Sequence, residues 1–101
     1  LSRKFYRVMS ANRRVAMKMI EPLVERGIVS YAAPQGGFYL FLKTDQQDTT
    51  DLCWSILNNA RVGLVPGVTF GKSVASFFRL CFARDADLLR EGIERIVRYF
   101  L

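Results

Sequence analysis

One arginine in an apolar stretch is the strongest chemical signal in this 101-residue sequence. Arg79 lies within the segment 77–82, Phe-Phe-Arg-Leu-Cys-Phe, whose composition is typical of a β-strand. Strand alternation places Arg79 on one face together with Phe77 and Cys81. A guanidinium among apolar side chains is costly to bury unless an anion meets it, and its planar fork fits a carboxylate through two parallel hydrogen bonds. The pattern indicates a carboxylate-binding arginine. The alternatives are an arginine on the solvated face of the sheet and one in a structural ion pair.

A glycine-containing loop precedes this strand and is the second signal. The segment 66–71 reads Pro-Gly-x-x-Phe-Gly, and glycine at such positions permits tight turns or close approach of the backbone to a ligand or another chain. Lys72 and Ser73 follow it, but no second glycine lies at the spacing of a P-loop, so a nucleotide-phosphate loop is not expected. The alternative is a loop that only connects two strands.

The composition excludes several kinds of catalytic site. The chain has no histidine, which removes Ser-His and Cys-His nucleophile pairs and histidine metal sites. Its two cysteines, Cys53 and Cys81, are too few for a disulfide framework or a zinc site, and we expect free core thiols in a reducing cytoplasm. The carboxylates between residues 85 and 94 are expected to cap and solvate a helix. We therefore expect no catalytic residue and no metal ligand in this chain.

The formal charge of +6 leaves nucleic acid, a membrane surface and small anions open as partners. Basic residues follow one face of the first expected helix, and aromatic residues do not interleave with them as stacking platforms would require. They are Arg3, Lys4, Arg7, Arg14 and Lys18. A solvated helix face is the favoured interpretation. No apolar run approaches the roughly 20 residues of a membrane span, and the N-terminal segment lacks the apolar stretch of a signal peptide. We expect neither nucleic acid nor membrane as a partner.

Apolar periodicity and turn residues predict the elements that position Arg79. The expected order is helix 2–26, a short extended piece 28–31, strand 38–42, helix 49–59, strand 62–65, strand 77–83 and a last helix from 85 or 87 to about 99. Ser2 and Asp48 are expected to cap helix starts, and Gly27 to end the first helix. Pro22 predicts a kink or a break near residues 19–21. The strand 38–42 is apolar at every position, which predicts burial on both faces.

These elements predict one α+β domain over residues 1–101, with a small, mainly antiparallel sheet and helices packed on one face. Half of the residues are hydrophobic and 13% are aromatic, which excludes intrinsic disorder. A chain of 11.6 kDa should expose roughly 5,800 Å² when folded. The sequence begins at Leu1 rather than Met, and we expect it to be a fragment of a larger protein or a processed chain.

Four segments together resemble one family. They are Pro34-x-Gly36-Gly37-Phe38-Tyr39-Leu40-Phe41, Val65-Pro66-Gly67-x-x-Phe70-Gly71, Phe78-Arg79-Leu80-Cys81-Phe82-Ala83, and a terminal helix with Ile93-Glu94-Arg95-Ile96. In this order and spacing the chain resembles the C-terminal small domain of a class I/II aminotransferase, a fold-type I PLP-dependent enzyme similar to aspartate aminotransferase. The first helix, with Tyr6 and residues 12–14, is similar to the helix that leads into that domain.

The resemblance implies a function for Arg79 and for the whole protein. In the family the matching arginine binds the substrate α-carboxylate while an amino group passes between an amino acid and a 2-oxo acid, with PLP as the electron sink. The Schiff-base lysine and the other PLP-binding residues lie in the large domain, so the resemblance implies no catalytic and no cofactor-binding residue here. It implies further that the isolated chain is inactive and binds no PLP, and that the full-length enzyme forms a homodimer.

Four alternatives remain open from the sequence. The same fold occurs in PLP-dependent lyases and synthases, and as a sensor domain in transcription regulators. A stand-alone α+β binding module that uses the basic helix is the third alternative, and a purely structural or interaction domain is the fourth. The side-chain specificity of an aminotransferase is not determined by these residues.

Overall fold

The structure is a computed structural model, and it describes residues 2–32 and 37–101. Within these residues the helices are α1 (Arg3–Glu25), α2 (Thr50–Ala60) and α3 (Ala86–Phe100). The strands are β1 (Ser30–Tyr31), β2 (Tyr39–Lys43), β3 (Val65–Pro66) and β4 (Phe77–Cys81). Two 3-10 turns, η1 (Gly67–Phe70) and η2 (Lys72–Val74), connect β3 to β4. The α+β class is confirmed.

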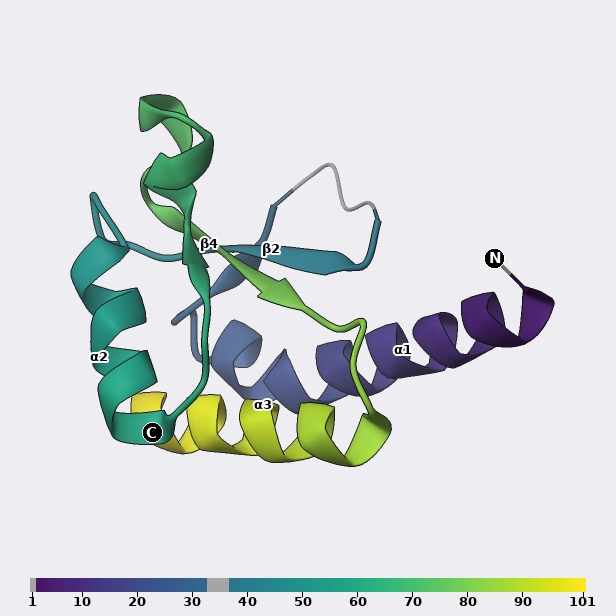
Figure 1. The fold of residues 1–101 in the computed structure, drawn as a ribbon. Coiled ribbons are helices and arrows are strands. Elements are labelled where there is room, and N and C mark those ends of the chain that lie inside the picture. The colour runs from purple at the N-terminus through teal and green to yellow at the C-terminus, as the bar shows by residue number, and fades with distance from the viewer. Residues whose placement is uncertain (1, 33–36) are drawn as a thin grey trace.

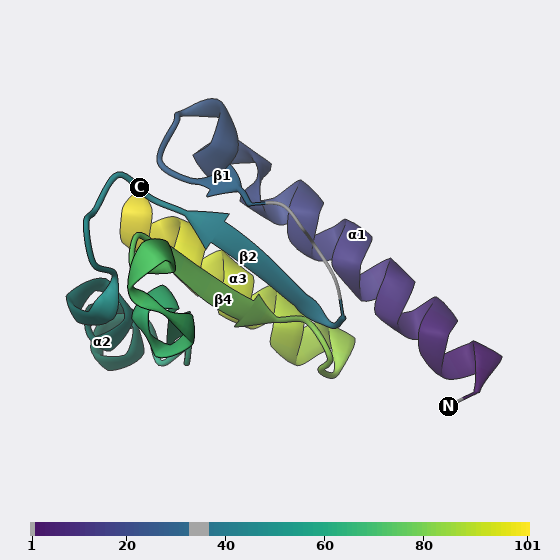
Figure 2. The ribbon, with the colours of Figure 1, turned by 90° about the horizontal axis from the view of Figure 1, so that it is seen from above.

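The strands form one antiparallel sheet in the order β1-β2-β4-β3. β2 and β4 occupy the centre, and their register pairs Phe41 with Arg79 and Leu40 with Leu80. The helices lie on one side of this sheet, with α1 and α3 side by side beneath it (Figures 1 and 2). The two 3-10 turns lie above the sheet, on its other side (Figure 1). The expected arrangement of helices on one face is therefore confirmed.

The helix ends follow the expected local chemistry. The Ser2 side chain accepts a hydrogen bond from the Phe5 N–H at 3.1 Å and begins α1. Asp85 accepts from two N–H groups and begins α3. The Asp48 carboxylate accepts from the Thr50 N–H at 2.8 Å, at the first residue of α2. These side chains satisfy amide groups that have no partner inside the helix.

Pro22 does not interrupt α1, so the expected break near residues 19–21 is wrong. The helix continues through Pro22 to Glu25, and Gly27 takes a φ of +71° after it. Pro22 is placed so close to the C-terminal end that the hydrogen bond lost through its missing N–H affects only the last turns. The Pro22 carbonyl still accepts from the Arg26 N–H at 3.2 Å.

The core lies between the sheet and the helices. It contains the alternating residues of β2 and β4 that face the helices and the inward residues of all three helices, among them Leu40, Leu42, Phe78, Leu80, Ile20, Ile56 and Ile93. The expectation that strand 38–42 is buried on both faces is wrong, because β2 alternates between buried and more exposed positions. The helices cover only one face of the sheet.

Apolar periodicity also predicts that Leu57 and Leu88 face inward on their helices, and for both leucines this prediction is wrong. Leu57 on α2 is 38% exposed and Leu88 on α3 is 60% exposed. Leu57 lies beside the exposed Trp54 on the outer side of α2. Leu88 lies in the first turn of α3, one residue away from the buried stripe that begins at Leu89. Both leucines are at the margin of an apolar stripe, where periodicity alone does not decide which side chain is covered.

A buried asparagine ties α1 to the end of β4. The Asn12 side chain is 4% exposed and donates to the Phe82 carbonyl at 3.0 Å and to the Arg84 carbonyl at 2.7 Å. Both carbonyls lie beyond the last residue of β4, where the sheet no longer supplies donors. Asn12 therefore fixes the chain between Arg79 and α3 against α1.

Candidate functional site

The face of the sheet that the helices leave uncovered carries the arginine identified from the sequence. Phe41 of β2 and Val65 of β3 flank Arg79 on either side in the register of the sheet. Phe77 and Cys81 lie on the same face, one alternation away on β4. We call these five residues, together with Tyr39 and Phe70, the open face.

Arg79 contacts two aromatic rings. Its guanidinium carbon is 3.9 Å from the ring centroid of Tyr39 and 4.6 Å from that of Phe70. Tyr39 comes from β2, and Phe70 comes from η1 directly after β3, so the rings arrive from the two strands that flank β4. Cation–π contacts at these distances are attractive and hold the guanidinium close to both rings.

The guanidinium has no polar partner among the described residues. Its Nε is buried without a hydrogen-bond partner, and the ion pairs found in residues 2–32 and 37–101 involve Arg95 and Arg98 instead. The alternative of a structural ion pair at Arg79 is therefore not supported. A half-buried cation whose polar groups lack a protein partner is suited to an external anion.

The loop 66–71 shapes this site through its first glycine. A Cβ atom on Gly67 would lie 1.9 Å from the Val74 carbonyl oxygen and 2.7 Å from that of Phe77. The backbone of η1 is thus packed directly against the segment that enters β4. This close approach returns the chain over the sheet, where the Phe70 ring contacts Arg79 and lies 5.9 Å from the Phe41 ring.

The acidic residues of α3 and the two cysteines, the other candidates from the sequence, have structural roles. Asp85 caps α3, and Glu91 and Glu94 form ion pairs with Arg95 and Arg98 along the same helix. Cys53 and Cys81 are free thiols. Burial raises the pKa of the Cys53 thiol, and the nearby Asp48 carboxylate raises it further, although a hydrogen bond with Thr49 opposes this. The buried thiol is therefore a poor nucleophile at neutral pH.

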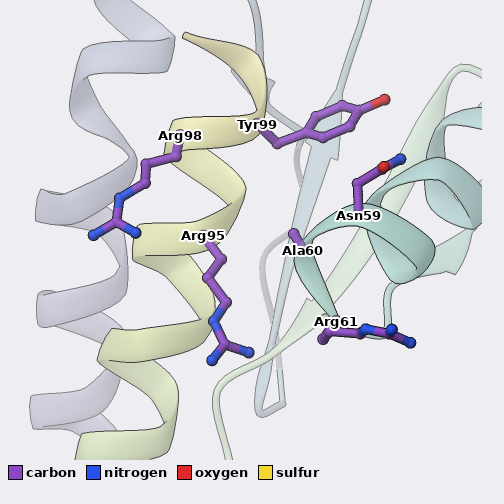
Figure 3. A pocket seen from close by; sticks show the side chains of 6 residues that line it. All are labelled: Asn59, Ala60, Arg61, Arg95, Arg98 and Tyr99. Atoms are coloured by element: carbon purple, nitrogen blue, oxygen red, sulfur yellow. The ribbon is translucent and has the colours of Figure 1, made fainter.

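A hollow of about 460 Å³ lies between the end of α2 and α3. It is lined by Asn59, Ala60, Arg61, Arg95, Arg98 and Tyr99 (Figure 3). Its three guanidinium groups point in different directions (Figure 3). Those of Arg95 and Arg98 are paired with the carboxylates of Glu91 and Glu94. They do not converge on one point as an anion site would require.

The described residues provide no further candidate site on the basic face of α1, at a metal centre or in a membrane span. The side chains of Arg3, Lys4, Arg7, Arg14 and Lys18 are all exposed. Among residues 2–32 and 37–101, no three Cys, Asp or Glu side chains are grouped so that they could hold a metal ion. None of the described helices combines the length and the hydropathy needed to cross a bilayer. Arg79 on the open face is therefore the best supported candidate site.

The comparison with protein families agrees with the resemblance found in the motifs. The profile described as "Aminotransferase class I and II" matches residues 8–96. The chain belongs to the class I and II aminotransferases. A probable N-acetyl-LL-diaminopimelate aminotransferase of Bacillus subtilis is 36% identical over 81 residues, which cover 78% of this chain and 20% of that protein. An aspartate aminotransferase of Thermotoga maritima is 38% identical over 78 residues, which cover 77% and 20%.

Solved aminotransferase structures share this fold. An aminotransferase from Mycobacterium tuberculosis superposes with a TM-score of 0.83 at 23% identity and covers 95% of this chain and 25% of its own. The Thermotoga maritima aspartate aminotransferase superposes with a TM-score of 0.66 at 31% identity, over 88% of this chain and 23% of its own. This aminotransferase chain thus spans about a fifth of the length of the curated relatives that it matches.

Sequence reasoning found Arg79 but missed both of its aromatic neighbours. Tyr39 and Phe70 lie in two of the motifs that carry the resemblance, yet the sequence predicts them only as parts of a strand and a loop. Their contact with Arg79 depends on the pairing of β2 and β3 with β4, which brings together residues up to 40 positions apart. The available signal was the Pro-Gly-x-x-Phe-Gly spacing, which sets Phe70 three residues after the turn at Gly67. The segment 34–36 of the first motif lies outside the described residues.

Proposed function

We propose that residues 1–101 are the C-terminal small domain of a PLP-dependent aminotransferase, and that Arg79 binds the α-carboxylate of its amino-acid and 2-oxo-acid substrates. The observation that carries this proposal is the unpartnered guanidinium on the open face. Two parallel hydrogen bonds from a fixed fork would orient the substrate, and a fixed orientation favours reaction at Cα.

The accessible surface area supports the proposal that residues 1–101 are one domain of a larger protein. The accessible area is 6476 Å², compared with about 5,800 Å² for a typical monomer of this mass. The open face contributes aromatic surface, since Tyr39 is 37% and Phe70 48% exposed. We propose that the large PLP-binding domain of the same chain covers this face, and that the full-length enzyme is a cytoplasmic homodimer.

The described residues do not fit PLP itself. The lysines Lys4 and Lys18 lie on the exposed side of α1, and Lys72 is exposed on η2. Lys43 is exposed at the end of β2, and its ammonium lies 5.9 Å from the centroid of the Phe77 ring. PLP supplies the electron sink in amino transfer, and we propose that the residues holding it lie in the large domain. This chain then contributes substrate binding and no catalytic residue.

The test is amino transfer by the full-length enzyme that contains residues 1–101. Standard amino acids serve as donors and 2-oxoglutarate as acceptor. Arg79→Lys replaces the fork with a single ammonium, and Arg90→Lys is the matched control on an exposed position of α3. Losing one charged hydrogen bond costs about 1.5–3 kcal/mol, so kcat/KM should fall roughly 10- to 150-fold in Arg79→Lys and stay unchanged in Arg90→Lys.

Two results would refute the proposal. One is a kcat/KM of Arg79→Lys equal to that of the wild type, which would remove Arg79 from the substrate site. The other is a visible absorption spectrum showing that the isolated 101-residue chain binds PLP stoichiometrically, because that would place the cofactor site within these residues.

A further inference from the structure

The way Arg79 is held has a consequence for substrate recognition. An arginine that binds a carboxylate is usually fixed by protein oxygens that accept from its remaining N–H groups, which orient the fork before the ligand arrives. Arg79 lacks such a partner on its buried Nε. What contacts its guanidinium instead are the rings of Tyr39 and Phe70.

We propose that Tyr39 and Phe70 are positioning residues that orient the Arg79 fork for an edge-on carboxylate. The inference rests on the proposed role of Arg79. Attractive contacts with two rings restrict the movement of the guanidinium, and its Nε is buried while its terminal nitrogens are not. The rim that carries the terminal N–H groups is then the polar part left for a ligand, and a carboxylate reaches it in the plane of the fork.

The two rings are held to different degrees. Tyr39 is a residue of the central strand β2 and pairs with Cys81 of β4, so the sheet fixes its backbone. Phe70 ends the 3-10 turn η1 and is supported by an edge contact with Phe41, their planes at 83°. Phe70 is also the more exposed ring, at 48%. Its removal should therefore loosen Arg79 with less disturbance of the sheet than removal of Tyr39.

The experiment compares two amine donors in the full-length enzyme. One is a good amino-acid substrate, and the other is the amine with the same side chain but without the α-carboxylate. Phe70→Leu keeps an apolar side chain but removes the ring, and Phe70→Tyr keeps the ring. Val68→Ala is the control, because Val68 is an exposed residue of the same turn.

The expected result is selective. Phe70→Leu should lower kcat/KM for the amino acid about tenfold, mostly through KM, while the rate with the amine stays within a factor of two. Phe70→Tyr should restore the amino-acid value, and Val68→Ala should resemble the wild type. In an Arg79→Ala background, Phe70→Leu should have no further effect on the amino acid, because the fork it orients is gone.

A spectroscopic measurement tests the geometry without catalysis. In ¹H–¹⁵N spectra of the same enzyme selectively labelled at arginine, the Arg79 side-chain signals should carry ring-current shifts that Phe70→Leu reduces and Phe70→Tyr keeps. Equal losses with the amino acid and the amine, or unchanged Arg79 signals in Phe70→Leu, would overturn the inference. If Arg79→Lys and Arg79→Ala are themselves fully active, the failure belongs to the proposed role of Arg79 rather than to the aromatic contacts.

Discussion

The glycine at position 67 provides a sharp test of the loop that carries Phe70. Gly67→Ala would place a Cβ atom 1.9 Å from the Val74 carbonyl oxygen, 2.7 Å from that of Phe77 and 3.0 Å from the Val74 carbonyl carbon. Real Cβ contacts are essentially never shorter than 3.0 Å. The two backbone segments must therefore separate by at least about 1.1 Å. Both oxygens belong to the backbone, so no side-chain rotation relieves the clash.

The loss of stability in Gly67→Ala can be estimated from this clash. Introducing an extra group into a packed site typically costs 1–3 kcal/mol, and we take about 3 kcal/mol because backbone must move. A domain of this size has a free energy of unfolding of about 5–15 kcal/mol. The melting temperature changes by about 4–8 °C per kcal/mol at this length, so Gly67→Ala should lower it by roughly 12–24 °C.

The assay is thermal unfolding followed by far-ultraviolet circular dichroism, with Gly63→Ala as the matched control. A Cβ atom on Gly63 would have no neighbour within 4 Å, and its φ is outside the range that favours glycine. Gly63→Ala should therefore be neutral or stabilise by up to about 1 kcal/mol. A melting temperature of Gly67→Ala within 2 °C of the wild type would refute the close packing of η1 against the entry to β4. It would also remove the structural reason given for the position of Phe70.

Two further predictions concern the ties between elements. Asn12→Ala should destabilise the fold by about 1–3 kcal/mol, because the Arg84 carbonyl loses its side-chain donor and the Phe82 carbonyl keeps only the Arg84 N–H. A urea midpoint equal to that of the wild type would contradict this, and the exposed Ser10→Ala is the control. Hydrogen bonds from the Thr50 side chain and backbone hold the pKa of Asp48 below its usual value. Its contribution to stability should thus be present above the ordinary carboxyl pKa near 4 and be lost as the pH falls through the lower folded value. Carboxyl-carbon NMR titration measures the pKa of Asp48 directly. Thr50→Val removes the hydroxyl, so the pKa of Asp48 should rise toward the ordinary value in this variant. An unchanged pKa would refute the assigned cause.

Local sequence signals predicted the elements well where one residue decides the outcome. Ser2 and Gly27 each act on the adjoining turn of a helix, and each is found in its expected role. Asp48 accepts from the first N–H of α2 as expected, although the N-cap residue is Thr49. The break that Pro22 predicts is absent, because the effect of a proline depends on how much helix follows it. The same residue that breaks the middle of a helix is tolerated near the end of α1, where few hydrogen bonds remain to be lost.

The site was only half predictable for a related reason. The chemistry of Arg79 follows from its own side chain and its immediate neighbours, so one strand was enough to identify it. The aromatic contacts of Tyr39 and Phe70 arise only when β2, β4 and the turn after β3 come together in one register. A shift of one residue in that register would move Tyr39 to the other face of the sheet, and no local pattern fixes it.

The failed expectation about the burial of residues 38–42 supports the proposed larger protein. Residues 38–42 are apolar at every position, which is typical of a strand covered on both faces. In the structure, the helices bury Leu40 and Leu42, while Tyr39 remains 37% exposed on the opposite side. A sequence that places apolar residues on both faces of a central strand is adapted to contacts on both. The second contact surface is the one that carries Arg79, so a domain docked there would both bury the aromatic residues and enclose the carboxylate site. Mutating Phe41 to Ser should then weaken docking of the large domain in the full-length enzyme, and equal protease resistance of the wild type and Phe41→Ser would argue against that docking.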